Sequence, residues 1–138
     1  MDVFVAAEMA ASPHRVAAIM FDPSRDPEWI GGARSVDPAV DPTAIGALTR
    51  RHGGFLGKKF SWMTEVVEHE RDALLRMKFV EGPMHGEVSY RIEPQGDGSR
   101  VSIRNQGGAG FALPGMAWML RRSVAKDLDR LKRLVETS

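Results

Sequence analysis

Hydrophobic and polar residues alternate through most of the chain between residues 46 and 107. This is the pattern of antiparallel strands that bury one face and expose the other to solvent. In residues 74–81, Leu75, Met77 and Phe79 share one face, and the basic residues between them share the other. Turn-forming residues separate the alternating stretches. We expect strands over residues 46–53, 58–69, 74–81, 84–94 and 100–107, with Gly53, Gly54 and Gly57 ending the first.

The second of these stretches is the longest, and its phase identifies the buried face of the sheet. Phe60, Trp62, Thr64 and Val66 alternate with more polar residues, so we expect them to line one concave face. Two valines in succession, Val66 and Val67, disturb this alternation. Such a disturbance indicates a β-bulge, in which one strand carries an extra residue.

The first forty residues contain the signals of a strand, two short helices and an edge strand. Residues 3–9 are mostly apolar and precede Ser12-Pro13, a helix N-cap with proline at the first helical position. The helix that begins there should end at Asp22-Pro23, and a second helical turn should cover Asp26 to Ile30. Two prolines interrupt residues 33–42, so we expect an edge strand there.

The C-terminal part of the chain has the periodicity of a helix. From about Leu113 to Glu136, apolar residues recur at spacings of three and four, with charged residues opposite. A helix of this length reaches about 35 Å, enough to cross a whole sheet. The sequence therefore predicts a single α+β domain over residues 1–138, with a seven-stranded curved antiparallel sheet packed around a long C-terminal helix. The apolar stripe is formed by Leu113, Met116, Ala117, Leu120, Val124, Leu128, Leu131, Leu134 and Val135.

Several local motifs resemble those of a known family. They are the helix SPHRVAAIM, the turn DPEWIGG, the stretch IGALTRRH, the pair Gly82-Pro83 between two strands, and the hairpin YRIEPQGDGSRVSI. With the order of the elements, they make nearly the whole chain similar to the START-like (SRPBCC) superfamily, and within it to the polyketide cyclase/dehydrase-like group. The resemblance implies a helix-grip fold with a deep apolar cavity between sheet and helix. It carries over no catalytic motif.

Composition and charge exclude several classes of protein. The 138 residues include 19 basic and 18 acidic ones, so the net charge of +1 gives no general attraction to nucleic acid or to anionic membranes. The absence of cysteine excludes disulfides, thiolate catalysis and cysteine-ligated metals. The N-terminus has no basic region, and no apolar run approaches the ~18 residues of a membrane span. We expect a cytoplasmic protein with no nucleic-acid partner and no stable membrane insertion.

The chain also lacks the signatures of a metal or a nucleotide cofactor. Its four histidines do not have metal-ligand spacing. The run Gly107-Gly108-Ala109-Gly110 precedes a helix but lacks the Lys-Ser/Thr of a phosphate-binding loop and the full dinucleotide fingerprint. No Gly-x-Ser-x-Gly elbow of a hydrolase is present. We therefore expect neither a cofactor nor a metal.

The space between the curved sheet and the helix is the expected binding site. A curved sheet cannot touch a straight helix along its whole length, and the gap between them forms a concave apolar pocket. Under the alternative interpretation, the same side chains simply fill the core. The expected lining residues are Trp29, Trp62, Met77, Phe79, Val88, Tyr90, Ile103, Asn105, Phe111, Met116, Leu120 and Val124.

The start of the C-terminal helix is apolar almost all round. Trp118 and Met119 fall off the apolar stripe, and a glycine-rich run precedes them. One interpretation is a mobile lid in which Phe111, Met116, Trp118 and Met119 gate the cavity. The others are packing against the loop of Trp29, or a surface for a second copy or another protein. We therefore expect a monomer or a homodimer.

A few polar residues are candidates for acid–base chemistry or for orienting a ligand. Strand parity predicts that His52, Glu81 and Asn105 point inward and that Arg51 faces the other way. Histidine exchanges protons near neutral pH. For each candidate, a structural or exposed role is the alternative. The candidates for catalysis are His52, Glu81, His85, Tyr90 and Asp127.

Asp127 is the one carboxylate close to the apolar stripe of the helix. A carboxylate there must be paired, solvated or protonated. It is either an acid of the pocket or the partner of Arg130, one turn further along. We adopt the ion pair as the expectation.

Two functions follow from these features. The first is binding of a small hydrophobic molecule, such as a lipid, an aromatic or a polyketide-like compound, driven by apolar burial. The second is an aromatase/cyclase or dehydratase-like (lyase-type) enzyme that acts on a polyketide-type substrate without a metal or nucleotide cofactor. That chemistry needs a proton donor and an acceptor in a dry cavity. We adopt binding as the main interpretation.

Overall fold

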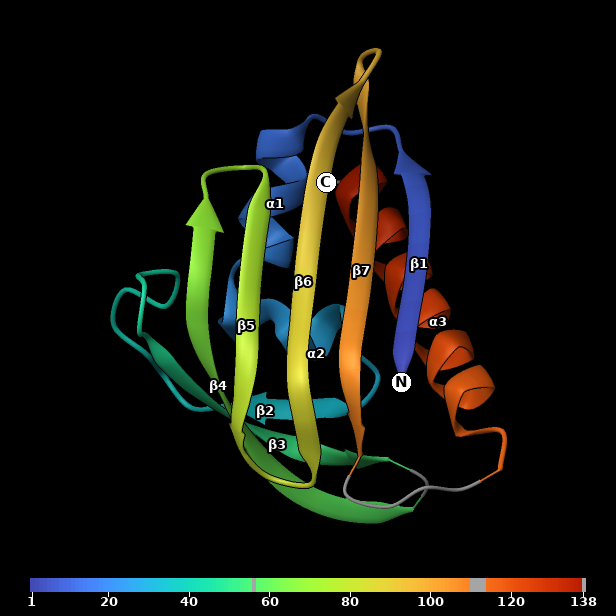
Figure 1. Cartoon of the computed structure of the whole chain (residues 1–138). Helices are drawn as coiled ribbons and strands as arrows, with labels where there is room; N and C mark the ends of the chain where they lie inside the picture. The colour runs from blue at the N-terminus through green and yellow to red at the C-terminus, as the bar shows by residue number, and fades with distance from the viewer. Residues whose placement is uncertain (56, 110–113, 138) are drawn as a thin grey trace.

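Seven antiparallel strands form one curled sheet, and the helices cover its concave face (Figure 1). The computed structural model describes residues 1–55, 57–109 and 114–137, with Gly108 and Ala109 described as backbone. The predicted α+β helix-grip fold is confirmed. Its elements are β1 (Asp2–Met9), α1 (Pro13–Met20), the 3-10 turn η1 (Pro23–Arg25), α2 (Asp26–Trp29), β2 (Ala33–Val36), β3 (Leu48–Phe55), β4 (Lys58–Glu70), β5 (Leu74–Glu81), β6 (Met84–Gln95), β7 (Gly98–Ala109) and α3 (Met116–Thr137).

The order of strands across the sheet is β1-β7-β6-β5-β4-β3-β2. The strands from β2 to β7 follow one another as neighbours, and β1 closes the other edge by pairing with β7. The expectation of an edge strand at residues 33–42 is confirmed for its first part, because β2 lies at the edge and ends at Val36, before the first proline. Figure 1 shows β3 and β2 curling across the lower end of the sheet.

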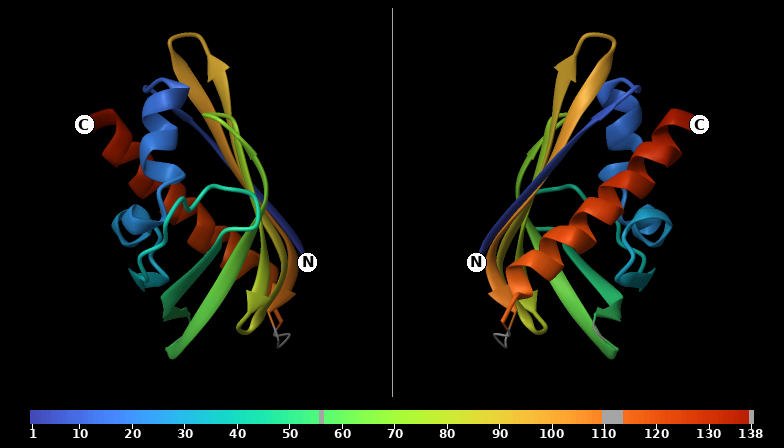
Figure 2. Two further views of the ribbon diagram at one scale, coloured as in Figure 1. Left: turned by 90° about the vertical axis from the view of Figure 1, so that its left-hand side faces the viewer. Right: turned by 90° about the vertical axis from the view of Figure 1, so that its right-hand side faces the viewer.

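The helices pack together on the concave side, as the two side views of Figure 2 show. Ser12 caps α1 as predicted, since its Oγ accepts a hydrogen bond from the amide of Arg15. The inward face of α1 is buried against the upper half of the sheet. In α3, Leu128, Leu131 and Val135 are buried almost completely, so this half of the helix forms an ordinary packed core with the sheet.

Two irregularities between β4 and β5 bend the sheet. The first is the predicted bulge at Val67, where Val66 pairs with Met77 but Glu68 pairs with Arg76. The second was not predicted: Met63 pairs with Glu81 and Thr64 with Phe79, so Val80 is the extra residue. Bulges of this kind bend a strand and increase its twist. They help the sheet to curl around α3.

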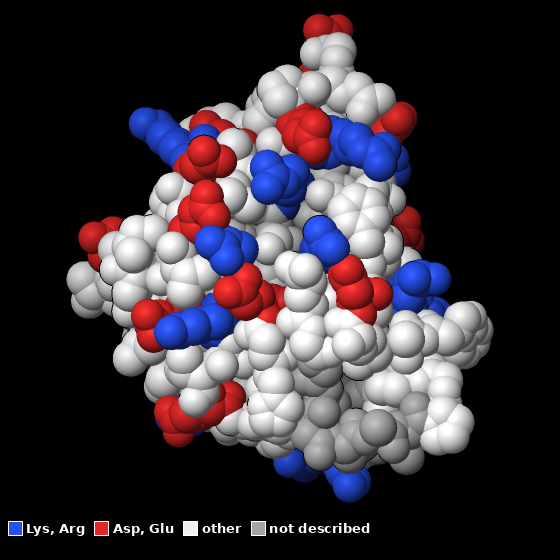
Figure 3. Space-filling model, viewed as in Figure 1, with Lys and Arg blue, Asp and Glu red and all other residues white. Residues whose placement is uncertain are grey.

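The outer face of the sheet is solvated and carries both signs of charge. Figure 3 shows acidic and basic side chains interspersed over it, which agrees with a net charge of +1. Arg76, for example, forms ion pairs of 2.9 Å with both Glu68 and Glu87 across neighbouring strands. Within the described ranges, no helix is long and apolar enough to cross a membrane.

The predicted end of the first hairpin strand is wrong. We expected Gly53 and Gly54 to end it, but β3 passes through both and continues to Phe55. The glycines are needed because the neighbouring strands approach closely here. A Cβ atom at Gly53 would collide with the carbonyl oxygen of Gly32 next to β2, and one at Gly54 would collide with that of Lys58. The break falls instead at Gly57, whose φ of +78° suits the turn into β4.

We predict that Gly53→Ala destabilises the protein by about 1–3 kcal/mol, because two backbones must separate to admit one methyl group. Urea unfolding measures this change. Gly96→Asn is the control, since Gly96 lies in an open turn with φ of +57°, a conformation that asparagine tolerates. Equal stability of Gly53→Ala and the wild type would contradict the close approach of β2 and β3.

Candidate functional site

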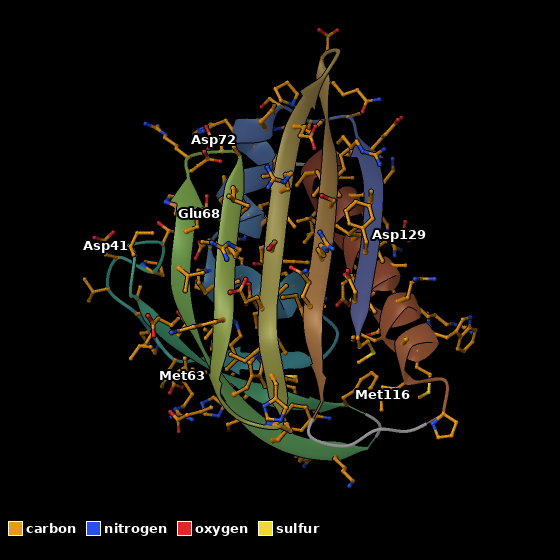
Figure 4. All side chains as sticks on the ribbon, in the orientation of Figure 1. Asp41, Met63, Glu68, Asp72, Met116 and Asp129 are labelled. Atoms are coloured by element: carbon orange, nitrogen blue, oxygen red, sulfur yellow. The ribbon has the colours of Figure 1, made fainter. Side chains whose placement is uncertain are left out.

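A cavity of about 210 Å³ lies between the concave face of the sheet, the first half of α3 and the loop that follows α2. The sheet contributes Trp62, Met77 and Val88, among others, and α3 contributes Leu120 and Val124. Met116, at the start of α3, also lines it; Figure 4 shows this residue at the lower end of the molecule, where the sheet curls. The cavity is therefore on the same side of the sheet as α1 but at the opposite end of the molecule (Figure 1).

The structure places most of the predicted lining residues around this cavity. Whether they contact a ligand stays a prediction. Phe111 lies outside the described residues. Those that line the cavity are Trp29, Trp62, Met77, Phe79, Val88, Tyr90, Ile103, Asn105, Met116, Leu120 and Val124.

Arg51 forms a buried ion pair with Asp26 in the wall of the cavity. Their side chains are only 4% and 1% exposed, and Arg51 Nε donates to Asp26 Oδ2 over 2.6 Å. Arg51 Nη1 also donates to Thr64 Oγ1, and Nη2 lies 3.9 Å from Met77 Sδ. Arg51 lines the cavity, with Asp26 as its partner in α2. The pair thus joins β3, the strand next to the edge strand β2, to the short helix that carries Trp29.

Burial has the largest single effect on the pKa of Asp26. Removal of the carboxylate from water raises its pKa to about 6, although the positive charge of Arg51 opposes this change. The hydrogen bond from Arg51 opposes it as well. Asp26 is therefore the carboxyl whose protonation near pH 6 alters the charge of the site.

The predicted orientation of β3 is wrong: Arg51 points inward and His52 points outward. Directly paired residues of antiparallel strands share a face, and Arg51 pairs with Trp62, which is buried. This pairing is a property of the two strands together, so the sequence of β3 alone did not show it. Asp26 gave no local signal either, because its partner lies 25 residues further along the chain.

His52 belongs to a polar cluster on the outer face of the sheet. Its side chain is 39% exposed; Nε2 lies 2.9 Å from Asp37 Oδ1 and Nδ1 lies 2.7 Å from Ser61 Oγ. Ser61 is directly opposite His52 on β4, and Asp37 follows β2. The cluster therefore links three neighbouring strands at the edge of the sheet, outside the cavity.

Glu81 also points outward, contrary to the prediction. The extra residue at Val80 reverses the parity after Phe79, so Glu81 pairs with Met63 and not with the inward Thr64. Its carboxylate accepts a hydrogen bond of 2.8 Å from Arg50. Asn105, by contrast, lines the cavity as predicted. His85, another candidate, also lines it, from the start of β6.

Tyr90 and Trp29 are in contact at the wall of the cavity. Their ring centroids are 5.7 Å apart and the rings meet edge to face at 66°. Burial raises the pKa of the Tyr90 hydroxyl, and the negative charge of Asp26 raises it further, so the hydroxyl stays protonated. The indole Nε1 of Trp29 is buried and has no hydrogen-bond partner among the described residues.

Asp127 forms the expected ion pair and also lines the cavity. Its Oδ1 accepts hydrogen bonds from Arg130 Nη1 at 2.7 Å and from the amide of Gly31 at 3.0 Å. Arg130 Nη1 additionally donates to the carbonyl oxygen of Trp29. Burial raises the pKa of Asp127, while the bonds from Gly31 and Arg130 oppose the rise. The pair fixes the loop after α2 against α3.

Trp118 does not line the cavity in this structure. It is 62% exposed, and the guanidinium of Arg122 lies 5.5 Å from the centre of its ring. This exposure does not fit the packing of Trp118 against the Trp29 loop. The lid and the contact surface for a second protein both stay predictions. In the parts of the chain that the structure describes, no cluster of three or more His, Asp or Glu side chains could hold a metal ion.

The family described as "Polyketide cyclase / dehydrase and lipid transport" has a sequence model that matches residues 2–136. No curated protein sequence matches the chain.

Solved structures show the same fold at low sequence identity. The protein TTHA0849 from Thermus thermophilus is 20% identical, with a TM-score of 0.82 over 98% of this chain and 97% of that one. The Zhui aromatase/cyclase from a Streptomyces species is 15% identical, with a TM-score of 0.78 over 99% and 93% of the two chains. The Aha1 protein from Colwellia psychrerythraea, described as a dimer, is 14% identical, with a TM-score of 0.73 over 99% and 96%. At these sequence identities, the likeness to the three structures shows a shared fold alone.

We predict that Arg51→Met and Asp26→Asn each lower the free energy of unfolding by about 3–5 kcal/mol, because each leaves a buried group without its partner. The double variant should lose less than the sum of the two. Chemical unfolding of the four proteins measures the coupling. Arg104→Met is the control, because its ion pair with Asp2 is half exposed and its loss should cost much less. Additive losses would contradict a coupled pair.

We also predict a pH dependence that comes from Asp26. Since the pKa of its folded form, about 6, exceeds its ordinary value of 3.8, the folded protein binds this proton more tightly than the unfolded chain. The contribution of Asp26 to stability is then fully present below pH 4 and is lost as the pH rises through 6, by an amount of the order of 2–3 kcal/mol. The stability difference between the wild type and Asp26→Asn, measured from pH 4 to 7, isolates this effect. If the stability difference instead grew in favour of the wild type as the pH rises, Arg51 would hold the pKa of Asp26 below its ordinary value, contrary to the prediction.

Proposed function

The chain belongs to the polyketide cyclase/dehydrase and lipid transport family, and from this premise we propose that it binds a small hydrophobic molecule in the cavity between the sheet and α3. The fold is one that holds hydrophobic ligands. The observation that carries the proposal is the cavity itself: a space walled by aromatic and aliphatic side chains, with a few polar groups among them. Apolar burial, at about 25 cal/mol per Å², would drive binding.

The size of the cavity favours a small ligand. An apolar cavity of about 150 Å³ in another protein is known to hold benzene, and the cavity here measures about 210 Å³. Pockets for drug-sized molecules begin at about 300 Å³. A body of one or two rings fits this space, and we propose a ligand of that size in preference to a lipid with two acyl chains.

An aromatase/cyclase or dehydratase-like enzyme is the alternative. The structural likeness to the Zhui aromatase/cyclase favours it, and so do His85, Tyr90 and Asp127, which all line the cavity. Two observations favour binding without turnover. His52 and Glu81 lie outside the cavity, and among the described residues none of the five acid–base candidates is hydrogen-bonded to another. Catalysis would require two titratable groups to meet on the bound ligand; a complex in which only one polar side chain contacts it would contradict the alternative.

We predict that naphthalene and 2-isopropylnaphthalene raise the Tm of the protein. At ten times its Kd, a ligand that binds only the folded state adds about 1.4 kcal/mol, which corresponds to a few degrees in a protein of this size. Differential scanning fluorimetry and tryptophan fluorescence measure the effect, since Trp29 and Trp62 both line the cavity.

The variant Leu120→Trp should abolish these shifts without unfolding the protein, because the larger ring occupies the space that the ligand needs. Met119→Trp, on the same helix but outside the cavity lining, is the matched control and should bind as the wild type does. If neither compound shifts the Tm of the wild type, or if both variants respond alike, the proposed site is wrong.

A further inference from the structure

Three side chains on the outer face of the sheet form a hydrogen-bonded chain of carboxylate, imidazole and hydroxyl. His52 lies in the middle: its Nε2 is 2.9 Å from Asp37 Oδ1, and its Nδ1 is 2.7 Å from Ser61 Oγ. The sheet brings the three together, because Ser61 is directly opposite His52 on β4 and Asp37 directly follows β2. None of the three lines the cavity, so the proposed binding function makes no use of them.

The carboxylate determines which nitrogen of the imidazole carries the proton. An ionised carboxylate can only accept a hydrogen bond, so Asp37 holds the proton of neutral His52 on Nε2. Nδ1 is then the acceptor, and the Ser61 hydroxyl donates to it. A carboxylate that orients a base, and a base that receives the proton of a serine, are the parts that activate a nucleophile. Ser61 lies inside a strand and not on a strand-to-helix turn, so no sequence motif for a nucleophilic serine indicates it.

A reagent in solution can reach this serine. Ser61 and Asp37 are exposed and His52 is partly exposed. Lys59 precedes Ser61 by two residues on β4, so the two side chains share the outer face. Lys59 is exposed and forms no ion pair with another described residue. Its positive charge can therefore stabilise the oxyanion that develops when Ser61 attacks a carbonyl carbon.

We propose that Ser61 is a nucleophile activated by His52, and that this surface cleaves reactive esters of small carboxylic acids. In the first step, Ser61 Oγ bonds to the acyl carbon, its proton passes to Nδ1 of His52, and the ester C–O bond breaks. The departing alcohol takes that proton. In the second step, water gives a proton to Nδ1 and attacks the acyl group, which releases the acid and returns the proton to Ser61. Asp37 is a positioning residue, because it acts through His52.

The openness of the site limits the class of substrate. The cavity does not bind the ester, so the gain over an unassisted serine is that of the general base, about 10²–10⁴-fold. Aryl esters and thioesters suit such a site, because their leaving groups need little help from a general acid. Esters of ordinary alkyl alcohols lack this advantage and should react much more slowly.

The aryl ester p-nitrophenyl acetate tests the proposal at pH 7.5. Peptide mass spectrometry locates the acetyl group, and absorbance follows the release of p-nitrophenolate. Ser35 is the matched control, because it lies directly opposite His52 on β2 but makes no hydrogen bond to it. We expect Ser61 to be acetylated about 100-fold faster than Ser35. Ser61→Ala and His52→Gln should each remove most of this reaction, while Ser35→Ala should react as the wild type does.

Several outcomes would overturn the inference. They are acetyl groups found on lysine amines alone, equal labelling of Ser61 and Ser35, and an unchanged release of p-nitrophenolate by Ser61→Ala. Because the substitutions change side chains at the surface, each variant should unfold at the temperature of the wild type, and its rate then reports on chemistry. The site is separate from the cavity, so these results leave the proposed binding function to its own test.

The tautomer of His52 distinguishes a positioning role of Asp37 from a merely structural one. The chain has 4 histidines, so a long-range ¹H–¹⁵N spectrum separates their ring nitrogens, and His52→Gln assigns one set. We expect the proton on Nε2 in the wild type. Asp37→Asn should give a mixture of tautomers and at least about tenfold slower acetylation of Ser61. A wild type with the proton on Nδ1 would contradict the proposal, because that nitrogen could not receive the proton of Ser61.

Discussion

The buried ion pair between Arg51 and Asp26 is the contact on which the geometry of the site depends. It joins β3, in the curled part of the sheet, to α2, whose last residue is Trp29. Neither side chain can move away from its partner by itself, because the buried charge left unpaired would cost several kcal/mol. The pair therefore fixes the distance between sheet and helix at one point of the cavity wall. The edge-to-face contact of Trp29 with Tyr90 is set by the same constraint.

A second polar contact holds the same loop from the opposite side. Asp127 on α3 accepts the amide of Gly31, and Arg130 reaches the carbonyl oxygen of Trp29. The loop after α2 is thus tied to the sheet through Asp26 and to the long helix through Asp127. Because both ties are made entirely by groups of the protein, the wall does not depend on a ligand for its shape, and preorganisation of this kind favours binding.

The sequence predicts those features that depend on local pattern and fails where partners come from far apart. Alternation located the strands, and the Ser12 cap located α1. Alternation did not reveal that Arg51 faces inward, since a charged side chain is normally solvated and its partner Asp26 lies on another element. Glu81 was placed on the wrong face because one extra residue, Val80, reverses the parity. Register and bulges are properties of strand pairs, so a single strand does not show them.

The cavity itself arises from curvature, and this explains why apolar pattern alone could not distinguish it from core. On α3 one continuous stripe serves both purposes: Leu128 and Leu131 are packed against the sheet, whereas Leu120 and Val124 border open space. The two irregularities of β4 and β5 flank the cavity residues Thr64, Met77 and Phe79, where the sheet bends away from the straight helix. The same kind of residue thus fills one end and leaves the other hollow. What separates the two ends chemically is the set of polar groups: Arg51, Thr64 and Asp127 line the hollow end, whereas Leu128 and Leu131 on α3 belong to the packed apolar core.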